Sequence, residues 1–243
     1  MTDAFLRMLA IIAATFLSMK IAVLAAARRE GTRLDACQTL MFLGWFGMRP
    51  ALFTRREECE GGVALLLKGL RAFAAGAILF AVAHAFSSIY LALPALSLML
   101  HFGVFDIVAG IYRMHGMAVT ELFRSPLRAR SLTEFWSRRW NIGFSEMIST
   151  LVQRPLRRVS ASGALYASFL ASGLLHELAI SVPVRAGYGL PTLYFLIHGA
   201  LVAFEKKTAR TYGRLWTLFW LAAPLPLLFH PPFLRGIVWP LVG

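Results

Sequence analysis

Residues 163–184 read GALYASFLASGLLHELAISVPV, a run of apolar and small side chains interrupted by one His–Glu pair. A helix that crosses a bilayer needs roughly 20 mostly apolar residues, because its backbone polar groups have to be satisfied within the segment. Similar runs occur at 4–27, 63–86, 89–111, 190–204 and 215–229. We therefore predict an all-α, polytopic transmembrane helical bundle with about six crossings and about six to eight helices.

The chain has 243 residues and a formal net charge of +13, a balance that can indicate nucleic-acid binding. Its basic residues, however, gather in every second link, after the first, third and fifth apolar runs. Cytoplasmic loops of membrane proteins are enriched in Lys and Arg, and no nucleic-acid-binding motif is recognisable. The charge therefore predicts membrane topology, with the basic links in the cytoplasm and no nucleic-acid partner.

The first apolar run is predicted to be a retained helix and not a signal peptide, since Lys20 interrupts it and arginines follow it. Both cysteines, Cys37 and Cys59, lie in the first basic stretch, where thiols stay reduced and no disulfide is expected. Compact loops and the lack of a transit peptide favour a bacterial inner membrane. With no repeat and no soluble domain, we expect one membrane-embedded domain over 1–243.

Two links are predicted to do more than connect helices. Residues 34–53 are apolar and aromatic but broken by glycine and proline, which suits an interfacial or re-entrant segment on the cytoplasmic side. Residues 112–160 combine arginines with Trp and Phe. That mixture is typical of a segment in the headgroup layer of a membrane.

A helix is predicted to start inside the second link, because Ser131 and Glu134 form a capping box before Leu132. On this helix Trp136 and Trp140 stand one turn apart. We expect an amphipathic helix in the cytoplasmic headgroup layer. Simple anchoring of the chain by its aromatic and arginine side chains is the alternative.

Ionisable side chains inside a span are expensive and mark functional sites. The candidates in the predicted spans are Lys20, His84, His101, Asp106, His176, Glu177, His198 and Glu205. Lys20 and His84 lie within reach of an interface. His101 and Asp106 are five residues apart and do not share a face of an α-helix. These four are therefore weak candidates.

His176 stands out, because it lies near the middle of its span, where Gly163, Ala167 and Ala171 form a small-residue face that lets another helix approach. An imidazole in apolar surroundings stays neutral, and a neutral imidazole accepts a proton as a general base must. The alternative is a histidine that only hydrogen-bonds to a neighbouring helix, and position alone does not decide between the two. His198 is a weaker candidate.

Other catalytic patterns are missing from the sequence. It has no nucleophile elbow, no Gly-rich phosphate loop, no His-Glu-x-x-His and no paired carboxylates in the spans. His176 and Glu177 are adjacent, but consecutive helical residues point in different directions, so the pair does not form a metal motif. We expect no metal site.

Three ordered motifs are SLTEFWSRRWN at 131–141, SGLLHE at 172–177 and FLIHG at 195–199. Together they resemble the wax-synthase branch of the membrane-bound O-acyltransferase family. WFGMRPALF at 45–53 and LPLLFHPPF at 225–233 extend the resemblance, so that 44–243 is the motif-bearing part. Related diacylglycerol and sterol acyltransferases have Phe-Tyr-x-Asp-Trp-Trp-Asn in the first motif. Arg138 replaces the Asp here, which favours the wax-synthase branch.

The resemblance implies acyl transfer from a thioester, usually acyl-CoA, to a hydroxyl group within a lipid bilayer. It implies no cofactor, with acyl-CoA as a co-substrate. Carried over by motif, His176 is the catalytic residue and Asn141 is its partner. We expect His176 to take the proton of a long-chain alcohol that attacks the acyl carbonyl, which yields a wax ester, while Asn141 orients the reactants or stabilises the oxyanion.

His198 and Glu177 are secondary site candidates. For binding of acyl-CoA phosphates or lipid headgroups we expect Trp136, Arg138, Arg139, Trp140, Arg154, Arg157 and Arg158. The acceptor alternatives to a fatty alcohol are diacylglycerol, a sterol-like alcohol and a glycan. A different class of function, a non-catalytic transporter or subunit with the same fold, also stays open.

Overall fold

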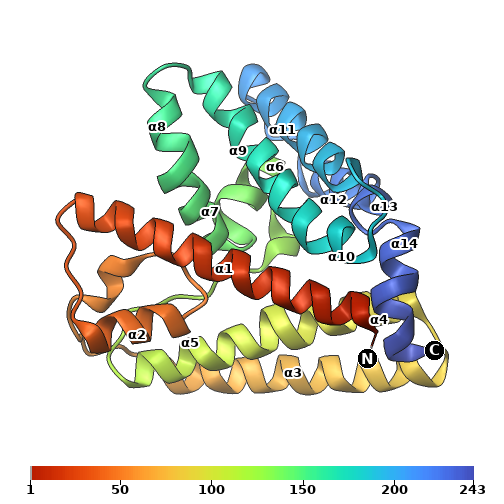
Figure 1. Ribbon diagram of the computed structural model, residues 1–243, viewed down its shortest axis with the longest axis horizontal. Helices are drawn as coiled ribbons and strands as arrows, with labels where there is room; N and C mark the ends of the chain where they lie inside the picture. The colour runs from red at the N-terminus through yellow and green to blue at the C-terminus, as the bar shows by residue number, and fades with distance from the viewer. Residues whose placement is uncertain (1) are drawn as a thin grey trace. The chain divides into compact units, whose positions relative to one another are not determined.

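The computed structural model describes residues 2–243, and the regular elements in that range are all helices (Figure 1). The chain forms two compact units. Unit 1 comprises the residues up to Met19 together with Arg124–Pro240, and unit 2 comprises Lys20–Phe123 together with Leu241–Gly243. The single domain expected over 1–243 stays a prediction, and the two units are described separately.

Among residues 2–243, four helices are long and apolar enough to cross a membrane: Asp3–Arg29, Gly62–Ala85, Ile89–Met114 and Ala161–Val184. A fifth crossing is possible if the pair Arg214–Leu228 and Pro231–Val242, bent by 68°, forms one broken span. The predicted all-α, multi-pass membrane fold is therefore confirmed. The count is lower than the six predicted crossings.

The missing crossing is α11 (Leu190–Thr208), which begins close to the predicted run. It forms one continuous helix of 19 residues, but its last turns carry Glu205, Lys206 and Lys207. Three charges make α11 too polar to pass as a span by length and composition. Its polar end instead becomes part of the pocket described below.

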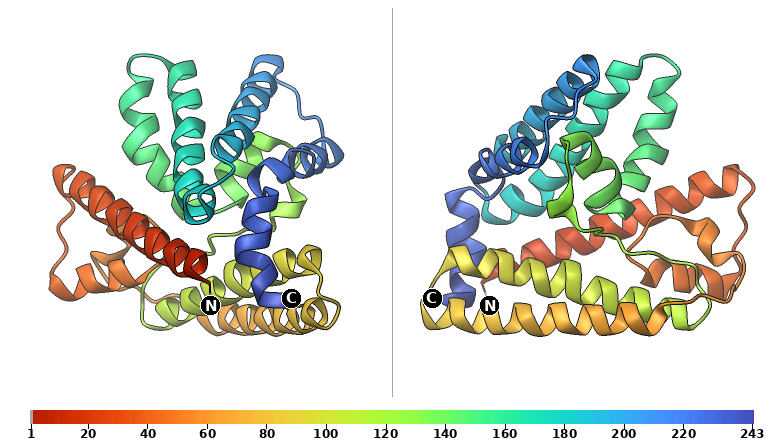
Figure 2. Two further views of the ribbon diagram at one scale, coloured as in Figure 1. Left: turned by 45° about the vertical axis from the view of Figure 1, so that its right-hand side comes forward. Right: turned by 180° about the vertical axis from the view of Figure 1, so that it is seen from behind.

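Unit 2 is built around a hairpin of two long helices that run side by side (Figures 1 and 2). Its elements are the C-terminal part of α1 (Asp3–Arg29), α2 (Ala36–Gly44), η1 (Pro50–Phe53), α3 (Gly62–Ala85), α4 (Ile89–Ser97), η2 (Leu98–Val104) and α5 (Phe105–Met114). Glycines line the contact. A Cβ atom at Gly69 would come within 2.6 Å of the Ile107 nitrogen, and one at Gly110 within 2.6 Å of the Leu66 nitrogen. The helices thus approach backbone to backbone, as small residues permit in membranes.

Lys20 is fully buried in unit 2, contrary to the prediction that it reaches an interface. Its ammonium group donates to the carbonyl oxygens of Phe42 at 2.7 Å and Gly47 at 2.6 Å, and it lies 3.9 Å from the centre of the Phe42 ring. The acceptors belong to the predicted re-entrant segment 34–53, which forms α2 and η1. Lys20 therefore donates to carbonyls at the break of this segment, where the Phe42 oxygen also accepts from the Trp45 N–H.

A second buried charge in unit 2 is Asp106, which is 1% exposed. Its carboxylate pairs with Lys68 at 2.9 Å, and the same ammonium group pairs with Glu121. Lys68 lies inside the span Gly62–Ala85, although it is not among the ionisable residues predicted for the spans. Lys68 joins α3 to α5 and to the segment that follows α5.

Unit 1 surrounds the contact between α9 (Ala161–His176) and α11, which lie side by side (Figure 2). The predicted small-residue face is wrong, since Gly163 is exposed. The close contact lies further along, where a Cβ atom at Gly173 would come within 2.8 Å of the Thr192 Cα atom. Phe169 packs in the same way over Gly199. This contact sets the spacing of the two helices that carry the histidine motifs.

Besides this pair and the N-terminal part of α1, unit 1 contains shorter elements. They are η3 (Pro126–Arg128), α6 (Leu132–Glu134), η4 (Phe135–Arg139), α7 (Ile142–Ile148), η5 (Ser149–Gln153), α8 (Arg154–Arg157), η6 (Glu177–Ser181), α10 (Val182–Val184), α12 (Arg214–Ala222), α13 (Leu225–Leu228), α14 (Pro231–Phe233) and η7 (Leu234–Val238); α15 (Trp239–Val242) ends the chain. The segments η4, η5, η6 and η7 are π-helical. Such widened turns are rare and are frequent at functional sites.

The helix predicted to start at Leu132 does so. The Ser131 hydroxyl accepts from the Glu134 backbone N–H at 3.0 Å, which is half of the expected capping box. The other half differs, because the Glu134 carboxylate accepts from the Arg130 N–H at 2.8 Å. The Glu205 carboxylate of α11 accepts from the N–H groups of Leu132 and Thr133, both at 2.9 Å. The start of α6 is thereby tied to α11.

Candidate active site

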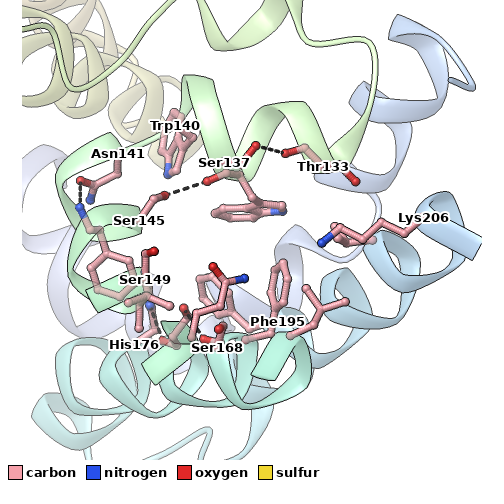
Figure 3. A pocket seen from close by; sticks show the side chains of 18 residues that line it. Thr133, Ser137, Trp140, Asn141, Ser145, Ser149, Ser168, His176, Phe195 and Lys206 are labelled. Carbon is pink, nitrogen blue, oxygen red and sulfur yellow. Dashed lines mark hydrogen bonds between the residues drawn. The ribbon is translucent and has the colours of Figure 1, made fainter. Parts of the chain in front are cut away.

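A pocket of about 290 Å³ lies within unit 1, lined by residues of α6, η4, α7, η5, α9 and α11 (Figure 3). Both residues predicted to be catalytic, His176 and Asn141, are among those that line it. The volume is at the small end of the usual range for ligand sites. The pocket therefore suits the reacting ends of two substrates and not a whole acyl-CoA.

His176 is the last residue of α9, and the π-helix η6 follows it. Its Nδ1 atom lies 2.7 Å from the Ser172 carbonyl oxygen. A carbonyl oxygen only accepts, so Nδ1 carries the proton and the Nε2 atom of a neutral ring keeps its lone pair. The ring is held by Phe195 on α11, with 4.3 Å between ring centroids. This tautomer is the one that a general base needs.

Asn141 caps the N-terminus of α7. Its φ of 42° lies in the left-handed region, which Asn tolerates better than most residues. The side-chain Oδ1 atom accepts from the Phe144 N–H at 3.1 Å. Because the oxygen is used in the cap, the amide NH₂ group is the end left to donate to a ligand. Local backbone geometry thus explains both the residue type and its orientation.

Two tryptophans of the first motif, Trp136 and Trp140, line the pocket. Trp136 packs against Phe195 with 5.4 Å between ring centroids, and Trp140 stacks on Phe135 at 5.5 Å. The predicted headgroup-layer helix is therefore wrong for Trp136, whose ring packs inside unit 1. These indoles form walls of the pocket.

The five arginines predicted to bind CoA or headgroups are not among the lining residues: Arg138, Arg139, Arg154, Arg157 and Arg158. Arg139 is occupied by a contact of 2.6 Å with Glu134 and by carbonyl oxygens of Arg124 and Ser125. Hydrogen bonds from the Arg130 backbone and from Arg139 lower the pKa of the Glu134 carboxyl. The other four arginines are exposed. Headgroup binding by them stays a prediction.

Neither secondary candidate lines the pocket. His198 is fully buried behind Trp136, with 5.3 Å between ring centroids, and its Nδ1 atom lies 2.9 Å from the Tyr194 carbonyl oxygen. The Glu177 carboxylate accepts from the Thr192 N–H and hydroxyl, both at 3.0 Å. Glu177 therefore caps α11, whose own N-cap is a glycine. The structure places both residues in supporting positions.

Sequence reasoning missed several polar residues of the pocket. Ser168 and Ser172 lie on the buried face of α9, and both line the pocket. Their spacing of four residues places them on one face of a helix, so the sequence 163–184 contains the signal that could have found them. Gln153 and Lys206 also line the pocket. Lys206 was assigned to a basic topological cluster, and no sequence signal separated it from its neighbour Lys207.

Unit 1 contains a second Ser–His contact, between Ser181 and His230 at 3.2 Å. The His230 Nδ1 atom accepts from the Phe233 N–H, so Nε2 carries the proton and donates to the serine. The serine hydroxyl in turn donates to the Gly187 carbonyl oxygen. A histidine that donates to the serine does not activate it as a nucleophile. This pair fixes the turn after η6 and α10.

Residues 119–197 match the family described as the Membrane bound O-acyl transferase family. The match includes the first two motifs, with Asn141 and His176, and it covers α9 and the first eight residues of α11. The resemblance predicted from the motifs is confirmed over this part of the chain.

Three plant proteins are similar to part of the chain. The chain is 37% identical over 106 residues to "Probable long-chain-alcohol O-fatty-acyltransferase 1" of Arabidopsis thaliana, covering 40% of this chain and 31% of that protein. It is 33% identical over 100 residues to the "Long-chain-alcohol O-fatty-acyltransferase" of Simmondsia chinensis, covering 37% and 28%. To "Acyl-CoA--sterol O-acyltransferase 1" of Arabidopsis thaliana it is 28% identical over 117 residues, covering 44% and 34%. The matched region spans about a third of these relatives' own length.

Proposed function

We propose that this protein transfers a fatty acyl group from acyl-CoA to the hydroxyl of a long-chain alcohol, which yields a wax ester and free CoA. The observation that carries the proposal is the His176 tautomer, with Nδ1 bonded to a carbonyl and Nε2 left as a proton acceptor in a pocket. The names of the plant relatives support the reaction class. Their sequences match only in part, so the activity itself is the proposal.

In the proposed reaction, the alcohol gives its proton to Nε2 of His176 while its oxygen attacks the thioester carbonyl carbon. The negative charge that develops on the carbonyl oxygen is stabilised by the NH₂ group of Asn141, whose Oδ1 atom is held in the α7 cap. The carbon–sulfur bond then breaks. The sulfur leaves with the proton from the imidazolium, giving neutral His176, the ester and CoA thiol. No covalent intermediate with the protein is formed.

The shape of the pocket limits what it holds. Its 290 Å³ volume takes the thioester and the alcohol hydroxyl with the nearest carbons. The rest of each aliphatic chain extends out of the pocket, and its apolar surface is stabilised in lipid or against apolar helices. The length of the acyl chain and of the alcohol is then selected by surfaces outside the pocket.

The acceptor is proposed to be a fatty alcohol because the relatives with more than 30% identity reported above carry that name. A sterol acceptor is represented by a more distant relative, and diacylglycerol and glycans remain alternatives. The protein is an integral, multi-pass membrane protein. Its placement in a bacterial inner membrane stays a prediction, since the relatives named above are plant proteins.

The proposal is tested with membranes that contain the protein, given labelled palmitoyl-CoA and one acceptor at a time. The acceptors are hexadecanol, a sterol, a diacylglycerol and a soluble sugar alcohol, and labelled products are separated by chromatography. We expect ester with hexadecanol above the level of membranes without the protein. If ester forms only with another acceptor, that acceptor replaces the fatty alcohol in the proposal. If no ester forms with any of the four, the proposal is overturned.

A further inference from the structure

Lys206 is the only Lys or Arg among the described residues that line the pocket, and Asp and Glu are absent from that lining. The ammonium group points into the pocket from the side opposite His176 (Figure 3). No hydrogen bond or ion pair to Lys206 occurs among residues 2–243. The pocket therefore has a neutral catalytic end and a positively charged end.

The neighbouring carboxylate of Glu205 does not neutralise this charge. Glu205 is 4% exposed and accepts from Leu132, Thr133 and the Trp216 indole N–H. These contacts hold it on the side of α11 that faces α6 and α12. Lys206 is left as a charge without a counter-ion in the pocket, and such a site favours an anionic ligand group.

The distance between the two ends follows from α11. Phe195 contacts the His176 ring, and Lys206 follows it by eleven residues on the same helix. At 1.5 Å per residue, Lys206 lies about 16 Å further along the helix axis. An anion held by Lys206 is thus separated from the reacting carbonyl by an extended linker.

We propose that Lys206 forms a phosphate-binding subsite that holds the carrier end of the acyl donor while the thioester reaches His176. The proposal rests on the proposed function and adds the residue that orients the donor. A lysine ammonium suits this task, because it binds phosphate as a point charge without a fixed geometry. Lys206 is exposed like most of the five arginines, but it lines the pocket and none of those arginines does.

The test compares Lys206→Gln with Lys207→Gln, a matched control on the same turn of α11 that does not line the pocket. Each variant is assayed with palmitoyl-CoA and with the N-acetylcysteamine thioester of palmitate, which has no phosphate. We expect Lys206→Gln to raise KM for palmitoyl-CoA about 5- to 10-fold, with kcat nearly unchanged. KM for the phosphate-free donor should not change, and Lys207→Gln should resemble the wild type.

Inhibition of palmitoyl-CoA turnover by free CoA and by pantetheine gives a second measurement. Lys206→Gln should weaken inhibition by CoA and not by pantetheine. Equal effects on both inhibitors, or no effect on either, would overturn the subsite.

Lipid composition distinguishes the two sources of phosphate. The assays are run in phosphatidylcholine vesicles with and without phosphatidylglycerol. An effect of Lys206→Gln that requires the anionic lipid would assign Lys206 to a headgroup and contradict the proposal. Failure of the proposed function is recognised separately, because the wild type would then make no ester with either donor.

Discussion

The buried charges of unit 2 and the pocket of unit 1 use ionisable residues in opposite ways. In unit 2, Asp106 pairs with Lys68, which also pairs with Glu121, and Lys20 donates to two carbonyl oxygens. In unit 1, His176 has one bonded nitrogen and Lys206 has no counter-ion. Apart from Glu121, which lies in the segment after α5, all of them lie in helices or at helix ends.

The position of an ionisable residue in a span therefore does not by itself indicate function. A charge whose partners satisfy it holds the fold together, since removing either partner leaves a costly buried group. A group with an unused donor or acceptor in a pocket is available to a ligand. The partners, and not the depth in the membrane, separate the two classes.

The largest expected effect comes from His176→Gln. Glutamine can still donate to the Ser172 carbonyl but has no basic nitrogen, so the general base is lost. We expect kcat to fall by about 10³-fold, within the usual range for a general base. The rate of ester formation in proteoliposomes measures this, and a rate within a few fold of the wild type would contradict it.

Two substitutions of Asn141 distinguish its role as a helix cap from its proposed role in catalysis. Asn141→Asp keeps an oxygen to cap α7 but lacks the NH₂ donor, so kcat should fall by about 10²-fold while the thermal unfolding midpoint stays near that of the wild type. Asn141→Ala loses the cap and adds strain at a positive φ, so the free energy of unfolding should fall by about 2 kcal/mol in total. If Asn141→Asp were fully active, the side chain would be only a cap.

In unit 2, Lys68→Met should destabilise the protein by about 3 kcal/mol, because Asp106 stays buried without its cation. Thermal unfolding in detergent measures the change. The double variant Lys68→Met/Asp106→Leu is the control, and it should recover most of the loss. If the double variant is no more stable than Lys68→Met, the loss of stability does not come from the unpaired Asp106 carboxylate.

A small pH effect is expected from Glu134. Its folded pKa lies below the ordinary value of 4.5, so the carboxylate contributes stability above that value and loses it as pH falls through the lowered folded value. The pair with Arg139 is partly exposed, and we expect Glu134→Gln to cost about 0.5 kcal/mol at neutral pH. The difference from the wild type should vanish in acid. A difference that grew in acid would contradict the pKa direction.

The sequence was sufficient for four of the six predicted spans and for the start of the helix at Leu132. It also led to His176 and Asn141, which line one pocket. Hydropathy identified the spans because each one is a local property of the chain. The motifs identified His176 and Asn141 by resemblance, and no spacing rule alone brings 141 next to 176.

The partners of the buried charges could not be predicted. Lys68 and Asp106 are paired by the packing of α3 on α5, and Glu177 reaches Thr192 only because α9 packs on α11. The π-helical segments were also missed, since apolar periodicity does not distinguish one widened turn from an α-helix. The role of Lys206 could not be predicted either, because only the direction of its side chain in the folded protein distinguishes it from Lys207.

The most direct measurement records the ester-forming rate and the unfolding midpoint on the same samples of wild type, His176→Gln and Lys68→Met. We predict that His176→Gln loses the ester-forming rate and keeps the unfolding midpoint. Lys68→Met should lower the midpoint and keep the rate per folded molecule, measured at a temperature where the variant is folded. His176→Gln with a normal rate, or Lys68→Met that is stable but inactive, would contradict the division between a reactive pocket and paired structural charges.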